Sequence, residues 1–270
     1  MLKLMYITND PQVAAIAQRA GVDRVFIDLE TVGKELRQGG MNTVKSQHSI
    51  SDIPKVKQVL TTSQLLVRVN PIYPGSEAEI NAVVEAGAEI IMLPFFHTPD
   101  EVRKFLDFVG GRAKTMLLFE TPAAVERIDE ILALDGIDEC FIGLNDLHLG
   151  YGRKFMFELL TDGTAEAICR KFAQANKPYG FGGIAKVGTG PLPAERIIGE
   201  HVRLGSTAVI LSRSFCNVAQ MPSMEAIAQT FLTEVPKIRA QEQAFRAQDL
   251  QALAANQAEV QRIVGQIAAG

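Results

Sequence analysis

The sequence has few cysteines and histidines and no excess of basic residues. Its 270 residues include three cysteines, four histidines, and 27 Lys plus Arg against 31 Asp plus Glu. The cysteines are scattered and odd in number, which disfavours a disulfide framework or a zinc knuckle and predicts buried free thiols. The histidines lack HxH and HExxH spacing, which disfavours a histidine metal site. A net charge of −4 gives no basic footprint, so nucleic acid is not an expected partner.

Long hydrophobic runs are also missing. No stretch approaches the ~20 apolar residues of a membrane helix. The opening segment MLKLMYITND has no extended apolar run followed by a small-residue cleavage site. We therefore expect a cytoplasmic protein that does not act at a membrane. The hydrophobic fraction of 47% is enough for a large core, and alternating strands and helices reach this length as one domain.

Eight short apolar or β-branched runs are typical of buried strands, and helix-compatible sequence separates each from the next. Several have lost the apolar/polar alternation of half-exposed sheets, which favours parallel strands covered by helices. The count and the repeat predict an α/β protein, a (β/α)8 TIM barrel. The expected strands are Leu2–Thr8, Arg24–Glu30, Gln64–Asn70, Glu89–Phe96, Lys114–Thr121, Glu139–Asp146, Pro178–Ala185 and Ala208–Phe215.

Amphipathic stretches between these runs predict helices, and an Ala-Gly pair before a strand predicts a helix end. Residues 1–222 are expected to form the barrel, and residues 223–270 a C-terminal helical extension that packs on the barrel or on a neighbouring subunit. A homo-oligomer, trimeric or hexameric, is expected. The clearest helical stretches are Pro11–Ala20, Ser76–Ala86, Pro99–Val109 and Ala165–Asn176.

One connection is unusually long and polar. Residues 31–52 follow the second strand and are too polar for core, which predicts an active-site loop. Its basic residues Lys34, Arg37 and Lys45, together with His48, are candidates to hold an anionic part of a substrate. His148 is the other histidine expected near the barrel mouth, as a rim residue.

Two carboxylates end neighbouring strands, at the side where TIM barrels carry their active sites. Glu120 follows an apolar run, and Asp146 follows the next strand after a glycine. Close carboxylates repel unless a proton or a cation neutralises them, and hard oxygen ligands with open positions suit Mg²⁺ or Mn²⁺. The two residues are therefore predicted metal ligands, with a metal-free acid/base pair as the alternative.

Other strand ends supply groups for substrate binding and catalysis. Arg68 ends a buried strand and requires an anionic partner, either a substrate carboxylate or a salt bridge to Asp28 or Glu30. Asp28 and Glu30 lie two apart on one strand, so both can face the mouth, and we expect at least one to position water or a general base. Gly143 and the other glycines of residues 143–152 allow backbone amides to approach a ligand closely, so Gly143 and Asn145 are predicted to bind substrate, with the Asn145 and Asp146 amides as candidates to hold a carboxylate.

The order of these motifs resembles the metal-dependent 2-oxo acid aldolase and citrate lyase beta-subunit family of the phosphoenolpyruvate/pyruvate barrel superfamily. The similarity covers about the first four-fifths of the chain. It implies that Glu120 and Asp146 bind Mg²⁺ or Mn²⁺ and that Arg68 holds a pyruvate-like group whose enolate the metal stabilises. The motifs are FIDLE at 26–30, LVRVN at 66–70, LFET at 118–121 and IGLNDL at 142–147.

The chain departs from the pyruvate aldolases of this group at one position. They place a histidine of the base machinery directly after Asp-x-Glu, where this chain has Thr31. The resemblance thus leaves the general base unassigned. It implies a carbon-carbon lyase acting on a small 2-oxo or 3-hydroxy acid. An acyl-CoA lyase of the citrate lyase type and a non-catalytic barrel that binds a small acid are the alternatives.

Overall fold

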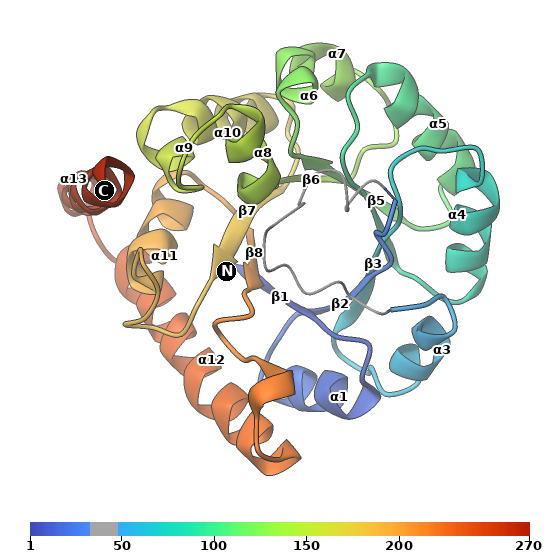
Figure 1. Ribbon diagram of the computed structural model, residues 1–270, viewed down its shortest axis with the longest axis horizontal. Coiled ribbons are helices and arrows are strands. Elements are labelled where there is room, and N and C mark those ends of the chain that lie inside the picture. The colour runs from blue at the N-terminus through green and yellow to red at the C-terminus, as the bar shows by residue number, and fades with distance from the viewer. Residues whose placement is uncertain (33–47) are drawn as a thin grey trace.

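The computed structural model describes residues 1–32 and 48–270, and it contains the expected barrel (Figure 1). Eight parallel strands close in sequence order, β1 to β8, and helices surround the ring. The strands are β1 (Lys3–Ile7), β2 (Arg24–Asp28), β3 (Gln64–Arg68), β4 (Ile90–Leu93), β5 (Lys114–Phe119), β6 (Glu139–Ile142), β7 (Tyr179–Ile184) and β8 (Ala208–Leu211). The predicted fold is therefore confirmed.

The described helices alternate with the strands, and short ones are added around β5 and β6. The four stretches predicted as helical are α1, α4, α5 and α10. The helices are α1 (Pro11–Arg19), α3 (Asp52–Lys57), α4 (Ser76–Glu85), α5 (Pro99–Val109), α6 (Pro122–Glu126), α7 (Ile128–Leu132), α8 (Leu144–Gly150), α9 (Glu158–Thr161), α10 (Thr164–Gln174), α11 (Ala194–Arg203), α12 (Met224–Arg246) and α13 (Leu250–Ala269), with the 3-10 turn η1 (Val218–Gln220).

Every strand ends earlier than the sequence predicts. The polar residues at the carboxyl ends leave the hydrogen-bonded ladder and turn into loops. The difference is largest at β6 and β8. β6 was expected to reach Asp146 but ends at Ile142, and Asp146 lies instead in the first turn of α8. At β4, Pro94 follows the last strand residue and has no N–H to donate. Of the residues expected to carry chemistry, Glu30, Glu120 and Asp146 thus lie beyond the strands, whereas Asp28 and Arg68 are the last residues of β2 and β3.

The interior of the barrel is apolar at mid-height and charged at both ends. The period of two along β2 places Arg24, Phe26 and Asp28 on the same inward face. Near the amino ends of the strands, Arg24 makes two bonds to Glu139 of β6, Nη1–Oε2 at 2.8 Å and Nη2–Oε1 at 2.6 Å. The guanidinium is fully buried, so this pair is closed to solvent. The interior apolar side chains are Met5, Phe26, Leu66, Ile90, Met92, Met116, Leu118, Phe141 and Ala208.

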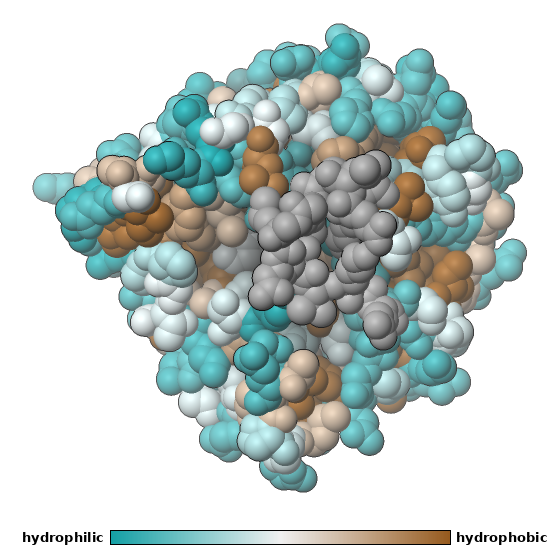
Figure 2. Space-filling view, viewed as in Figure 1, coloured by the Kyte–Doolittle hydropathy of each residue, from teal (hydrophilic) through white to brown (hydrophobic). Residues whose placement is uncertain are grey.

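The two C-terminal helices pack against the helices of their own barrel. α12 lies on α1 and α11, and α13 lies on α11 and α9. Buried Glu242 of α12 accepts the backbone N–H of Leu2 at 2.6 Å, and buried Asn256 of α13 donates to the Arg196 carbonyl at 3.1 Å. Hydrophobic surface is visible where α13 lies (Figure 2), and Leu250, the first residue of α13, is 84% exposed. Association into a trimer or hexamer stays a prediction.

Two smaller expectations from the sequence are also confirmed. Cys140, Cys169 and Cys216 are buried free thiols. Gly21 and Gly87 adopt φ of 92° and 104°, the left-handed conformation that ends a helix before a strand. None of the described helices combines the length and hydrophobicity needed to span a bilayer.

We predict that His201 makes the protein sensitive to acid. Its ring is buried on α11, stacks on Phe181 at 3.8 Å, and contacts the Ser206 hydroxyl at 2.7 Å. Burial lowers its pKa from 6.5 to about 3. The folded state therefore keeps the ring neutral while the unfolded chain takes up a proton, and stability falls as the pH drops from 6.5 towards 3.

Chemical denaturation at a series of pH values measures this effect. Between pH 6.5 and 3, the unfolding free energy of the wild type should fall more steeply with decreasing pH than that of His201→Asn. The two slopes should differ by up to about 1.4 kcal/mol per pH unit. His97→Asn, at an exposed histidine, controls for the loss of an imidazole. An unchanged slope in His201→Asn would show that burial of this ring does not set the acid sensitivity.

Candidate active site

Asp28 and Arg68 face each other at the mouth of the barrel. They are register partners at the ends of β2 and β3. The Arg68 Nε lies 2.9 Å from Asp28 Oδ1, and Nη2 lies 2.9 Å from Asp28 Oδ2. Glu30 adds a third contact, with Oε2 at 3.2 Å from Nη1. Both carboxylates are buried. The salt-bridge alternative for Arg68 is therefore confirmed, and both acidic residues face the mouth as expected.

The charge of Arg68 is held firmly in this environment. Burial acts to lower the pKa of Arg68, but Asp28, Glu30 and Glu120 raise it above its ordinary value. The Phe26 ring lies beneath the guanidinium, 5.7 Å from its central carbon to the ring centroid. The side chain remains 15% exposed, in contrast to the fully buried Arg24. Arg68 is thus a fixed cation that still reaches the opening of the barrel.

Glu120 follows β5, and two neighbouring segments hold its carboxylate in place. It is 4% exposed, and its Oε1 accepts the backbone N–H of Phe95 at 3.0 Å. Phe95, in the loop after β4, has φ of 47°, which is uncommon for a bulky residue. This strained backbone turns the N–H towards Glu120, and strain of this kind gathers at functional sites. Phe95 was not singled out in the sequence, where no pattern reveals a positive φ.

Gly143 brings the start of α8 against Glu120. A Cβ at position 143 would lie 2.6 Å from Glu120 Oε2 and 2.7 Å from Glu120 Cβ. Gly143 is the residue before α8, and Asp146 lies three residues further on, in its first turn. Asn145 is exposed and donates to Asp146 Oδ1 at 3.3 Å. The Glu120 carboxylate therefore lies beside the segment that carries Asp146, the other predicted ligand.

The donor set fits a hard divalent cation. Glu120 and Asp146 offer carboxylate oxygens, which Mg²⁺ and Mn²⁺ prefer. Across residues 1–32 and 48–270 there is no group of three or more His, Cys, Asp or Glu side chains arranged to hold a metal. A site with two protein carboxylates leaves its other positions to water and substrate oxygens, as Mg²⁺ sites commonly do.

His48 lies at the mouth as the sequence predicts, whereas His148 does not lie at the rim. His48 Nδ1 accepts the backbone N–H of Asp28 at 3.0 Å, so a proton on its neutral ring belongs to Nε2. His148, expected at the rim, is buried within α8, with Nδ1 3.2 Å from the Leu144 carbonyl oxygen. Thr31 is exposed, and its hydroxyl points to Asn70 Oδ1 at 3.4 Å. Lys34, Arg37 and Lys45 lie outside the described residues.

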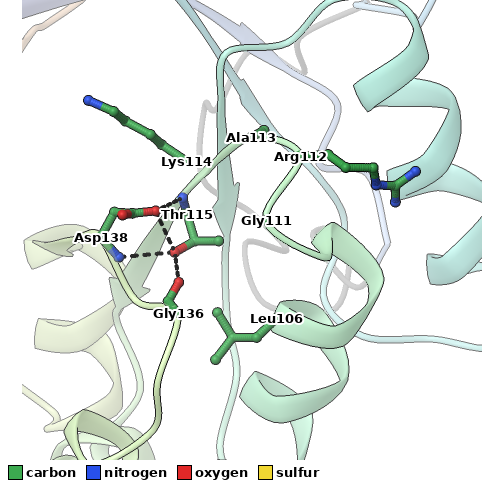
Figure 3. A pocket seen from close by; sticks show the side chains of 8 residues that line it. All are labelled: Leu106, Gly111, Arg112, Ala113, Lys114, Thr115, Gly136 and Asp138. Carbon is green, nitrogen blue, oxygen red and sulfur yellow. Dashed lines mark hydrogen bonds between the residues drawn. The ribbon is translucent and has the colours of Figure 1, made fainter.

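A separate pocket of about 460 Å³ opens at the opposite end of the barrel (Figure 3). Its polar groups already satisfy one another: Thr115 donates to the Gly136 carbonyl oxygen at 2.6 Å, and its N–H donates to Asp138 at 2.8 Å. The lining residues precede or begin β5 and β6. Because TIM barrels carry stability at this end and chemistry at the other, the pocket is not a candidate active site.

The HpcH/HpaI aldolase/citrate lyase family is matched by residues 3–200. A hydroxypyruvate/pyruvate aldolase from Roseovarius nubinhibens is 25% identical over 175 residues, which are 53% of this chain and 62% of that protein. The chain therefore matches less than two thirds of the length of this relative.

Solved structures share the fold. An HpcH/HpaI aldolase from Desulfitobacterium hafniense DCB-2 has a TM-score of 0.61 at 18% identity, covering 78% of this chain and 86% of its own. An HpcH/HpaI aldolase/citrate lyase family protein from Burkholderia cenocepacia J2315 has a TM-score of 0.59 at 15% identity, covering 81% and 91%. The citrate synthase SbnG has a TM-score of 0.59 at 16% identity, covering 77% and 84%. At these identities the likeness concerns the fold alone.

We predict that Gly143→Ala displaces Glu120. The added methyl group cannot be accommodated at 2.6–2.7 Å from Glu120, and the carboxylate is also tied to Phe95. The free energy of unfolding should fall by about 1–3 kcal/mol, as in other overpacked cores. A crystal structure of the variant should show the carboxylate moved away from the Phe95 N–H.

Gly265→Ala is the matched control. Gly265 lies in α13 with no atom within 4 Å of an added Cβ, so the same change there should stabilise the helix slightly. If Gly143→Ala unfolds like the wild type and leaves Glu120 in place, the close approach described above is wrong.

Proposed function

Because the chain belongs to the HpcH/HpaI aldolase/citrate lyase family, we propose that it is a divalent-metal-dependent carbon-carbon lyase acting on a small 2-oxo or 3-hydroxy acid. The observation that carries the proposal is the arrangement around Arg68, where Asp28, Glu30 and Glu120 all act on one guanidinium at the barrel mouth. A fixed cation beside potential metal ligands suits an acid that bears a carboxylate and a carbonyl or hydroxyl. The named activity of the Roseovarius relative supports pyruvate or hydroxypyruvate as the donor.

Glu120 and Asp146 are the residues that would hold the metal. Glu120 is buried and fixed by the Phe95 N–H, whereas Asp146 is partly exposed at the start of α8. One ligand would thus be set by the barrel and the other would face the opening. A bound Mg²⁺ or Mn²⁺ would stabilise negative charge that develops on a substrate oxygen.

Arg68 is proposed to orient the substrate acid. Its Nε and Nη2 groups donate to Asp28, and Nη1 forms an ion pair with Glu30. The N–H groups that do not donate to Asp28 are proposed to bind a ligand oxygen. The two acidic residues thereby fix the plane of the guanidinium, and such preorganisation favours a defined substrate geometry. The backbone amides of Asn145 and Asp146 at the start of α8 are proposed to bind a substrate carboxylate. Gly143, predicted for substrate binding, donates its own N–H to the Phe119 carbonyl oxygen at 3.0 Å.

Proton transfer must come from a group other than Thr31. Its hydroxyl is exposed and directed to Asn70, and a threonine hydroxyl is a poor base at neutral pH. Asp28 and Glu30 are engaged with Arg68 and are proposed to position it. One of these carboxylates is proposed to act, directly or through a positioned water molecule, as the base that accepts the substrate proton. A carboxylate base of this kind would replace the histidine expected from the resemblance.

We predict that Asp146→Ala abolishes lyase activity. The assay mixes pyruvate or hydroxypyruvate with a panel of aldehydes and Mn²⁺ or Mg²⁺, and follows aldol product by chromatography. The variant should lose at least about 100-fold in kcat/KM, in line with the loss of an electrostatic group that acts in the transition state. Chelation of the metal should abolish wild-type activity, and added Mn²⁺ or Mg²⁺ should restore it.

Asp129→Ala is the control because that carboxylate lies on α7 at the surface and pairs with the exposed side chain of Lys171. It should keep wild-type activity. Retention of activity by Asp146→Ala, or by the wild type after complete metal removal, would refute the proposed metal site. Turnover of acyl-CoA thioesters but of no 2-oxo acid would favour the acyl-CoA lyase alternative.

A further inference from the structure

The side chain of Asn70 continues the β2–β3 ladder past the ends of both strands. The last backbone bond of this pair runs from Leu29 N to the Arg68 carbonyl at 2.9 Å. Beyond this bond, the acceptor is a side chain. The backbone N–H groups of Thr31 and Val32 both donate to Asn70 Oδ1, at 2.8 and 2.9 Å. One amide oxygen thus anchors the two residues that directly follow Glu30.

Glu79 on α4 determines which way the Asn70 amide points. Its Oε1 accepts from Asn70 Nδ2 at 2.7 Å and from the Asn70 backbone N–H at 3.3 Å. Both side chains are buried, at 8% and 9% exposure. A carboxylate can only accept, and the backbone N–H groups of Thr31 and Val32 can only donate. The reversed amide would place oxygen against carboxylate and NH₂ against two donors, so a single orientation is allowed.

The turn between β3 and α4 builds this contact. Tyr73 N donates to Ser76 Oγ at 2.9 Å, and Ser76 N donates to the Tyr73 carbonyl at 3.0 Å, so the chain reverses and α4 begins at Ser76. Glu79 then lies one helical turn into α4 and faces back to the end of β3. Burial raises the pKa of Glu79, while the hydrogen bonds from Asn70 and Tyr73 oppose the rise.

We propose that Glu79 is a positioning residue of the active site, which acts through Asn70 to fix the chain after Glu30. Glu30 lies between two anchors: its own N–H donates to Asp28 Oδ1 at 3.2 Å, and the next two N–H groups donate to Asn70. Its carboxylate meets Arg68 at 3.2 Å. Loss of the second anchor releases Glu30 and so loosens the guanidinium that binds the substrate. The inference rests on the proposed function for the role of Arg68.

The key variant is Asn70→Asp, which keeps an oxygen acceptor for Thr31 and Val32 but sets a carboxylate 2.7 Å from that of Glu79. The two charges repel, so the anchor opens. Hydrogen exchange of the Thr31 and Val32 amides should accelerate at least about tenfold, and kcat/KM should fall by about 10- to 100-fold. Activity should recover partly as the pH is lowered, because one shared proton restores the hydrogen bond.

The double variant Asn70→Asp/Glu79→Gln tests the direction of the contact. The glutamine NH₂ donates to the new carboxylate, whose other oxygen still accepts from Thr31 and Val32, so slow exchange and activity to within about threefold of the wild type should return. Asn70→Asp/Glu77→Gln is the matched control, because Glu77 is exposed on α4, and it should not rescue. Equal melting temperatures show that the variants are folded. If Asn70→Asp alone does not fold, Glu79→Ala takes its place and should accelerate the same two amides.

Hydrogen exchange tests the positioning role of Glu79, and lyase activity tests the proposed function. Exchange of Thr31 and Val32 requires no substrate. Wild-type exchange in Asn70→Asp or Glu79→Ala, or failure of Glu79→Gln to rescue folded Asn70→Asp, overturns the positioning role. Rescued exchange in a protein whose wild type has no lyase activity overturns the proposed function and leaves the anchor as a structural element.

Discussion

Closure of eight parallel strands into one cylinder is the constraint on which the rest of the structure depends. Parallel strands in a closed ring all finish at the same end, so residues far apart in the sequence meet at a single mouth. The two-residue period then selects which of them face inward. Asp28 and Arg68, separated by 40 residues, become register partners, and Glu120, the residue after β5, joins their electrostatic environment.

Two ion pairs inside the barrel lie at opposite ends of the strands and differ in their exposure to solvent. Arg24 and Glu139 pair at the amino ends of the strands, where the guanidinium is inaccessible and both Nη atoms bind the same carboxylate. Arg68 has a similar pair of bonds to Asp28 at the mouth, but its side chain is 15% exposed and retains N–H groups for another oxygen. The first pair lies closed off from solvent at the amino ends of the strands, and the second leaves a partly exposed cation at the mouth, where we propose that it binds the substrate.

The mouth is organised by backbone amides as much as by side chains. Phe95 has an unfavourable φ, and its N–H donates to Glu120. Gly143 has no side chain, which allows the start of α8 to approach the same carboxylate. After β2 and β3, Asn70 accepts a hydrogen bond from the backbone that follows Glu30, and Glu79 orients the Asn70 amide. Each of these contacts fixes the orientation of a charged group, or of the backbone next to one, and the function proposed for these groups depends on that orientation.

The amino-acid sequence by itself determined the number and order of the strands, the barrel class, the burial of the cysteines and the acidic and basic residues that gather at the mouth. These follow from local apolar runs and from the rule that parallel strand ends share one edge. Only the tertiary structure decided that Asp146 begins a helix, that His148 is buried, and that Arg68 pairs with both Asp28 and Glu30. It also decided the orientation of Asn70 by Glu79. These outcomes depend on register and on loop closure between segments, and no local pattern of residues encodes such long-range contacts.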